Sequence, residues 1–87
     1  MKRHEAREKA LTIASVNIKS THEKVRGQAL AIFKALVDQR RSVDCALKAA
    51  LECIELGGDI AATGLELLNY LLYRVDYYYK EASKHRD

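Results

Sequence analysis

The sequence predicts an all-α fold, a compact three- or four-helix bundle with a long C-terminal helix. Three observations support this. The chain of 87 residues has no proline and only four glycines, so it lacks most of the residues that interrupt helices and shape turns. Apolar residues recur at spacings of three and four in four successive segments, which is the period of one helical face. The length suits a single domain, residues 1–87, with one core.

The first predicted helix covers about residues 3–18 and places Leu11, Ala14 and Ile18 on one face. The following segment 20–23, Ser-Thr-His-Glu, has the form of a capping box, in which the serine oxygen accepts a backbone amide and the glutamate reaches back. A second helix is therefore expected from about residue 21 to residue 39. Gly27 is interpreted either as the site of a close helix crossing, which is favoured, or as an exposed weak point of the helix. The apolar stripe of this helix comprises Val25, Ala29, Ile32, Phe33, Leu36 and Val37.

A third helix is predicted over residues 43–56, with Ser42 as its N-cap and Asp44 in its first turn. The second and third helices could instead form one bent helix. Gly57 and Gly58 can adopt the positive φ that ends a helix, and Asp59 is expected to cap the next one. No internal repeat or linker is visible. The predicted buried stripe comprises Val43, Ala46, Leu47, Ala50, Leu51 and Ile54.

The fourth predicted helix, about residues 59–85, is the longest, and its apolar residues lie on far more than one face. At roughly 1.5 Å per residue it would be about 40 Å long. A helix that is apolar over most of its circumference has to be enclosed, so we expect a partner to cover what the other helices leave exposed. One stripe comprises Gly64, Leu68, Leu71, Val75, Tyr78 and Ala82; two further rows comprise Leu65, Leu72 and Tyr79, and Tyr70, Tyr73 and Tyr77.

Composition and motifs argue against several classes of protein. With 31% charged residues and no uncharged run of the roughly 18 residues that a membrane span needs, no membrane association is expected. The opening segment lacks an apolar signal core, which predicts a cytoplasmic protein. Cys45 and Cys53 have neither zinc-site nor disulfide spacing. Cys45 faces away from the apolar stripe and is predicted to be the reactive or interface thiol of the two.

Enzymatic signatures are missing as well. The sequence has no glycine-rich phosphate loop, no H-E-x-x-H and no nucleophile motif. His4 and Glu8 lie one helical turn apart, but two ligands do not make a metal site. We therefore expect no enzyme, no cofactor, no metal and no small-molecule substrate.

The tyrosine-rich C-terminal helix is the predicted functional surface. Tyrosine and arginine are enriched in protein interfaces, so the first hypothesis is a regulator, inhibitor or accessory subunit that binds a protein partner or itself, for example as a homodimer. Two other interpretations are half-buried core tyrosines and a platform for stacking nucleic-acid bases. The predicted partner-binding residues are Tyr70, Leu72, Tyr73, Arg74, Tyr77 and Tyr79.

The alternative hypothesis is a small RNA- or DNA-binding protein. Residues 1–26 carry seven Lys or Arg against three Glu, a balance of +4, and such a cluster can follow a phosphate backbone. A solvated helix start is the simpler interpretation of the same charges. The predicted nucleic-acid-binding residues are Lys2, Arg3, Arg7, Lys9 and Arg26.

A short resemblance also points to RNA. Residues 1–3, Met-Lys-Arg, followed by residues 6–11, Ala-Arg-Glu-Lys-Ala-Leu, resemble the first helix of the NusB family of transcription antitermination factors. In that family a basic N-terminal segment contributes to RNA binding, so the resemblance implies RNA as a partner. It covers about a dozen residues, and the family's longer second half has no counterpart in this chain.

Overall fold

The computed structural model describes the backbone of residues 2–84 and the side chains of residues 2–74 and Lys80. Within this range the chain forms four α-helices and no strand, so the predicted all-α bundle is confirmed. The second and third helices are separate, joined by residues 39–42, and the single bent helix is wrong. The helices are α1 (Arg3–Asn17), α2 (Glu23–Asp38), α3 (Val43–Leu56) and α4 (Gly58–Lys84).

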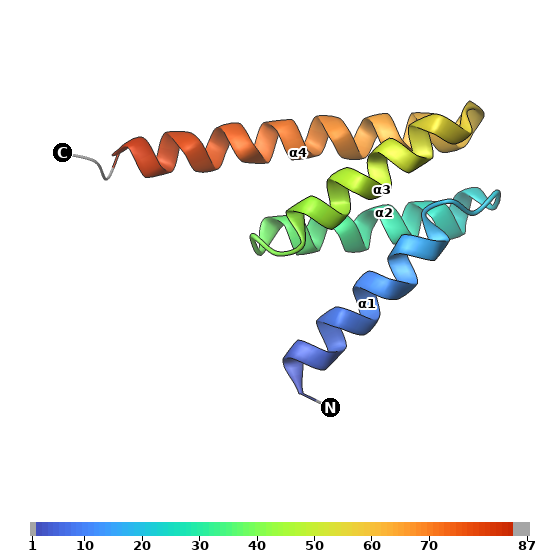
Figure 1. The fold of residues 1–87 in the computed structure, drawn as a ribbon, viewed down its shortest axis with the longest axis horizontal. Helices are drawn as coiled ribbons and strands as arrows, with labels where there is room; N and C mark the ends of the chain where they lie inside the picture. The colour runs from blue at the N-terminus through green and yellow to red at the C-terminus, as the bar shows by residue number, and fades with distance from the viewer. Residues whose placement is uncertain (1, 85–87) are drawn as a thin grey trace.

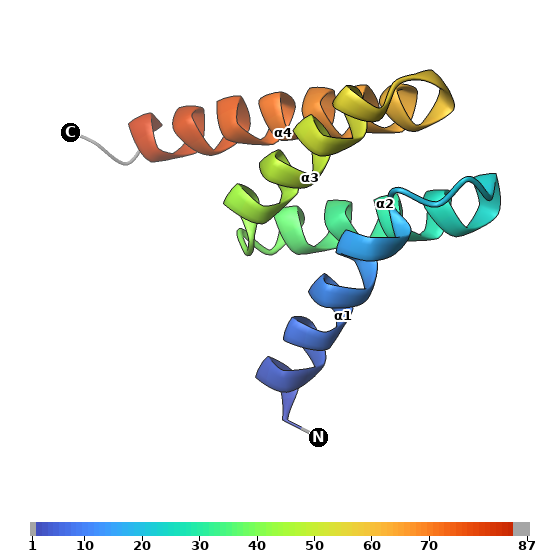
Figure 2. The same ribbon diagram turned by 45° about the vertical axis from the view of Figure 1, so that its right-hand side comes forward.

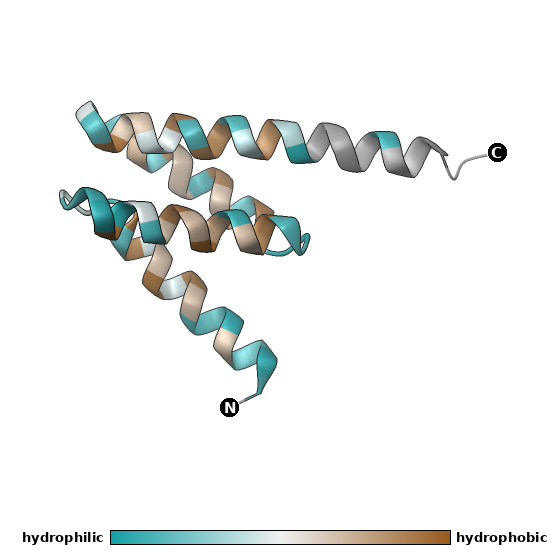
Figure 3. Cartoon of the chain, turned by 180° about the vertical axis from the view of Figure 1, so that it is seen from behind, coloured by the Kyte–Doolittle hydropathy of each residue, from teal (hydrophilic) through white to brown (hydrophobic). Residues whose placement is uncertain are grey.

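The four helices form two stacked hairpins. Hairpin 1 consists of α1 and α2, and hairpin 2 of α3 and α4; α2 joins them by packing on α4. Figures 1 and 2 show α2 and α4 running side by side in the same direction, with α1 and α3 crossing them obliquely. Seen from behind, α2 and α4 lie in front of α1 and α3, so the molecule has two layers (Figure 3).

The two hairpins share part of their burial pattern at an offset of 35 residues, the distance that separates the starts of α2 and α4. Ala14 and Ala49, which differ by 35 in number, are both buried on the first helix of their hairpins. Three further buried pairs have the same offset: Ile18 and Cys53, Ala29 and Gly64, and Leu36 and Leu71. Two of the four pairs are identical in sequence and two are not, so the correspondence is one of burial, and no internal repeat is visible in the sequence itself.

One core runs through both hairpins. Its fully enclosed larger side chains are Phe33, Ile18, Leu67, Val37 and Cys53. On α3 the core face consists of small residues: Ala46, Ala49, Ala50 and Cys53. This corrects the predicted stripe, since Leu47 and Leu51 are exposed. Because α3 meets both α2 and α4, it turns its small residues inward, where they allow close approach, and its leucines outward. Likewise on α2, Val25 is exposed and Leu30 is buried.

The close helix crossing lies at Gly64 and not at Gly27. A Cβ atom built on Gly64 would lie 2.6 Å from the carbonyl oxygen of Ala50 and 2.8 Å from Cβ of Cys53. Gly27 is exposed and has no such neighbour within 4 Å. The lack of a side chain at Gly64 therefore lets α4 approach α3 closely. The crossing favoured at Gly27 is wrong, and Gly27 is exposed, as in the alternative interpretation.

The predicted helix ends are correct to within about two residues, but their caps differ. Helix α2 begins at Glu23, and the Ser20 hydroxyl accepts a hydrogen bond from the backbone N–H of His22 at 3.1 Å, so no capping box forms. Ser42 precedes α3 with a positive φ of 56° and makes no side-chain cap. Gly57 and Gly58 have positive φ as predicted, and α4 begins at Gly58. Asp59 therefore lies inside the first turn of α4.

Helix α4 is 27 residues long, whereas α2 has 16. Its C-terminal turns extend past the ends of α2 and α3 in Figure 1. Among the described residues no helix has both the length and the apolar character that crossing a bilayer requires.

Candidate functional site

Two of the predicted partner-binding residues hold α4 against α2. The Tyr70 hydroxyl donates a hydrogen bond to Oδ1 of Asp38 on α2. Nε of Arg74 lies 2.8 Å from the same carboxylate oxygen and 3.2 Å from the Tyr70 hydroxyl. The Arg74 guanidinium also sits over the Tyr70 and Tyr73 rings, 5.3 Å and 5.7 Å from their centres. Tyr70 and Arg74 thus make intramolecular contacts, and their contact with a partner stays a prediction.

The environment of Tyr70 disfavours ionisation of its phenol. Partial burial raises the pKa of Tyr70 above its usual value of 10.0, and the hydrogen bond to Asp38 raises it further, whereas Arg74 opposes the shift. The phenol therefore remains a hydrogen-bond donor over the whole neutral pH range. The cluster of Tyr70, Asp38 and Arg74 is a polar clamp between the two hairpins.

Two other predicted residues, Leu72 and Tyr73, are open to solvent, with 63% and 66% of their surface exposed. Neighbouring helical residues point about 100° apart, so these two side chains lie on different sides of α4. Tyr73 lies beside Arg74, at the edge of the polar clamp, and Leu72 lies further round the helix, away from the clamp. Tyr77 and Tyr79 lie outside the described side chains.

Leu72 belongs to an apolar surface formed by both helices of hairpin 2. The contact of Gly64 with Ala50 fixes the register of the antiparallel pair, which places Leu51 level with Leu65 and Leu47 level with Leu68. Leu68 is half-buried, and the other four leucines are exposed. We call this surface the leucine face; it consists of Leu47 and Leu51 on α3 and Leu65, Leu68 and Leu72 on α4.

The leucine face points away from hairpin 1. The side of α4 that meets α2 carries Thr63, Glu66 and Tyr70, each bonded to an α2 side chain. The leucines lie on the opposite side of the hairpin, so nothing in the described chain covers them. The apolar spacing of the third helix did not predict this surface, because it placed Leu47 and Leu51 in the core. The small residues between them, Ala46 and Ala50, could have indicated which side faces inward.

A second apolar surface lies on the outer side of hairpin 1. It is a shallow groove of about 290 Å³ between α1 and α2. Val25 and Ile13 are exposed along it, and Ile32 is half-buried. We call it the hairpin-1 groove; its lining residues include Ile13, Ala14, Val25, Gln28, Ala29 and Ile32.

The predicted nucleic-acid-binding residues do not form one surface. Arg26 is buried, with 6% of its surface exposed. Its Nε donates to the Thr63 hydroxyl and its guanidinium NH1 donates to the carbonyl of Ser20, both at 2.9 Å. Arg26 is therefore a structural residue, and its predicted role in nucleic-acid binding is corrected.

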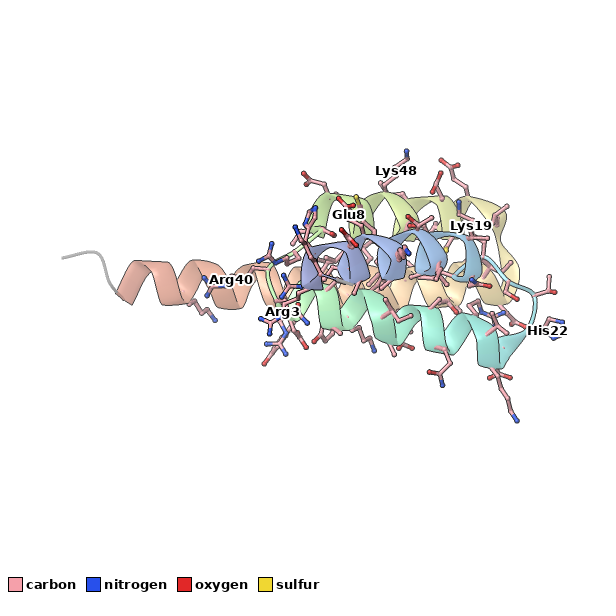
Figure 4. The ribbon with its side chains drawn as sticks, turned by 90° about the horizontal axis from the view of Figure 1, so that it is seen from below. Arg3, Glu8, Lys19, His22, Arg40 and Lys48 are labelled. Atoms are coloured by element: carbon pink, nitrogen blue, oxygen red, sulfur yellow. The ribbon has the colours of Figure 1, made fainter. Side chains whose placement is uncertain are left out.

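Other basic residues do come together at one end of the bundle. Arg7 lines a groove of about 370 Å³ with Arg40 and Arg41, which the 39–42 loop supplies. Arg3 lies one helical turn before Arg7, and Figure 4 shows Arg3 and Arg40 at this same end. Lys2 and Lys9 are exposed, and Lys9 lines a different surface of α1. We call Arg3, Arg7, Arg40 and Arg41 the basic end.

The groups that could support chemistry are few. Among the described residues no three His, Cys, Asp or Glu side chains gather in a way that could hold a metal ion. Cys45 is exposed and Cys53 is buried. Burial raises the pKa of the Cys53 thiol, which lies 3.7 Å from the carbonyl oxygen of Ile18. A buried, protonated thiol is a poor nucleophile.

Comparison of the chain with protein-family models, with curated proteins and with solved structures gives no match. The short resemblance of residues 1–11 to the NusB family is thus not accompanied by a family-wide match, and function has to be argued from the surface itself.

Proposed function

We propose that this chain is a non-enzymatic protein-interaction module, acting as a regulator, inhibitor or accessory subunit, which binds a protein through α4. The observation that supports the proposal is the leucine face. Its exposed leucines lie side by side on two packed helices, and Tyr73 adds an exposed aromatic ring on α4. Of the residues predicted to bind a partner, Leu72 and Tyr73 are therefore the proposed anchors.

The energetics favour covering this surface. Fully burying a leucine side chain is worth about 1.5 to 3 kcal/mol, and four leucines of the face have between 41% and 63% of their surface exposed. Covering all four would contribute roughly 3 to 6 kcal/mol by the same scale. Association itself costs several kcal/mol, so additional contacts such as those of Tyr73 are needed for tight binding.

Crosslinking from defined positions tests the proposal. A photo-crosslinking phenylalanine analogue is placed at Leu72 and, as a matched control, at Ala62, which is exposed on the same helix but outside the face. After irradiation in cells we expect a protein adduct from position 72 and none from position 62. Leu65→Glu in the same chain should abolish the adduct. Equal adducts from both positions, or none from position 72, would contradict the proposal.

A second candidate function is nucleic-acid binding at the basic end. The observation that favours it is the convergence of Arg7 with Arg40 and Arg41, which lie more than 30 residues apart in the sequence. With Lys2 and Arg3 on the adjacent first turn, this end could contact a phosphate backbone. Arg26 takes no part in it because it is buried.

Salt dependence tests this second candidate. If three phosphates are neutralised, the affinity for duplex DNA should fall about 40-fold between 50 and 200 mM salt. Arg7→Glu/Arg41→Glu should abolish binding, as measured by fluorescence anisotropy with a labelled RNA strand and a labelled DNA duplex. Lys24→Glu, a charge reversal at an exposed residue near the start of α2, should have little effect. Equal losses in both variants would exclude a site at the basic end.

A further inference from the structure

Two residues of the leucine face lie 35 positions after residues of α2 that are buried. Leu30 and Val37 lie on the side of α2 that carries Arg26 and Lys34, whose side chains bond to α4. Both are buried, with 8% and 1% of their surface exposed. Counting 35 positions onward gives Leu65 and Leu72, which are 50% and 63% exposed. On α2 these positions are packed inside the chain, whereas on α4 the equivalent positions are exposed to solvent.

The hairpin-1 groove corresponds in the same way to the opposite side of hairpin 2. Ile60 and Leu67 of α4 pack into the shared core, Leu67 completely. Their equivalents 35 positions earlier are Val25 and Ile32, which line the open groove. In stacked repeat proteins, terminal units need a polar outer face to remain soluble. Here both outer faces carry apolar residues.

We propose that a second copy of this chain occupies the leucine face, docking through its hairpin-1 groove in a head-to-tail stack that repeats the contact between hairpin 1 and hairpin 2. This inference rests on the proposed interaction function and names its partner. The two surfaces fit because α2 and α4 already pack on each other inside the chain. The leucine face carries equivalents of buried α2 residues, and the hairpin-1 groove carries equivalents of α4 residues that pack into the core.

Charge at the positions that form ion pairs inside the chain is compatible with such a stack. The internal contact contains ion pairs of Lys34 with Glu66, at 2.9 Å, and of Asp38 with Arg74, at 2.8 Å. The equivalent positions are Asn69 and Tyr73 on hairpin 2 and Ala31 and Gln39 on hairpin 1. All four are uncharged, so these positions bring no like charges together when two copies stack. Tyr73 takes the place of Asp38 and Gln39 takes the place of Arg74, so the tyrosine hydroxyl and the glutamine amide can form a hydrogen bond there.

A head-to-tail contact has a distinctive signature, because it joins two different surfaces and therefore produces open chains or rings of copies. The average mass in analytical ultracentrifugation should therefore rise beyond that of a dimer as the concentration increases. Leu65→Glu/Leu72→Glu removes the leucine face, and Ile13→Glu/Val25→Glu removes the hairpin-1 groove. Each variant alone should be monomeric. An equimolar mixture should form a 1:1 dimer, because one intact leucine face then meets one intact groove.

Several results would overturn the stack. A two-fold symmetric contact between leucine faces would leave Ile13→Glu/Val25→Glu dimeric by itself. A mixture that stays monomeric, with both variants showing wild-type helicity by circular dichroism, would also contradict the inference. If a variant loses helicity, Leu65→Gln/Leu72→Gln and Ile13→Gln/Val25→Gln replace the pair. A wild-type chain that is monomeric at 100 µM refutes self-stacking, whereas an adduct from position 72 to a different protein would keep the interaction function.

Discussion

Arg26 on α2 donates a hydrogen bond through Nε to the hydroxyl of Thr63 on α4, at 2.9 Å. Its NH1 group donates to the carbonyl of Ser20 in the loop that precedes α2. One buried guanidinium therefore links the α1–α2 connection, α2 and α4. Since hairpins 1 and 2 meet mainly through α2 and α4, Arg26 contributes to the contact that holds the two units together.

Replacing Arg26 by Met should lower the free energy of unfolding by about 2 kcal/mol, because hydrogen bonds to a charged group are worth roughly 1.5 to 3 kcal/mol. Urea denaturation measures the change. Lys24→Met, on the exposed side of the same helix, is the matched control and should alter stability by less than about 0.5 kcal/mol. Equal stabilities of the two variants would show that the hydrogen bonds of Arg26 contribute little.

Two glycines within helices should respond in opposite ways to alanine. Gly64→Ala inserts a methyl group 2.6 Å from the Ala50 carbonyl oxygen, and such overpacking typically costs about 1 to 3 kcal/mol. The methyl group that Gly27→Ala adds has no neighbour within 4 Å. This variant should therefore stabilise the chain by up to about 1 kcal/mol through helix propensity. Thermal unfolding of both variants tests this. A stabilising Gly64→Ala would mean that α3 and α4 can separate without loss.

The Tyr70 phenol should make stability depend on alkaline pH. Its pKa is raised in the folded chain, so the folded state holds the proton more tightly than the unfolded state does. The resulting stabilisation is present below pH 10 and is lost as the pH rises through the folded pKa. Tyr70→Phe should cost about 1 kcal/mol at neutral pH. The gap between Tyr70→Phe and wild type, measured in urea, should narrow above pH 10; a gap independent of pH would contradict the assignment.

The two cysteines should differ in reactivity. Cys45 is exposed and Cys53 is buried, and burial raises the pKa of Cys53, which depletes the reactive thiolate. With Ellman's reagent at pH 8, one thiol per chain should react quickly, and the second only at the rate of unfolding. Cys45→Ser should remove the fast phase. Two thiols reacting at one common rate would show that Cys53 is accessible in the folded chain.

Periodicity and glycine placement were enough to predict the helices and their ends. The spacing of apolar residues gave four segments close to the observed helices, and Gly57 and Gly58 marked the α3–α4 turn with the positive φ they show. These signals are local, because each depends on residues within a few turns of one another. The capping box was predicted wrongly because α2 begins at Glu23 rather than at about Thr21, the start that the Ser20 cap implied.

The candidate surface was only partly predictable. Exposure of Leu72 and Tyr73 was consistent with the prediction that α4 has more apolar circumference than its neighbours cover. The leucine face could not be predicted, because an apolar stripe does not reveal which of its edges faces a neighbour. On α3 the small residues pack inward, and the leucines that seemed to belong to the core lie outside.

Periodicity along the chain was sufficient to predict that the protein is helical, where its helices lie and that α4 carries apolar residues on more than one side. The stacking of the helices as two hairpins, the burial of Arg26 and the crossing at Gly64 could be seen only in the three-dimensional arrangement. The physical reason is that periodicity depends on neighbours along one helix. The rotation of each helix about its axis is set instead by which side chains allow the closest approach of helices distant in sequence.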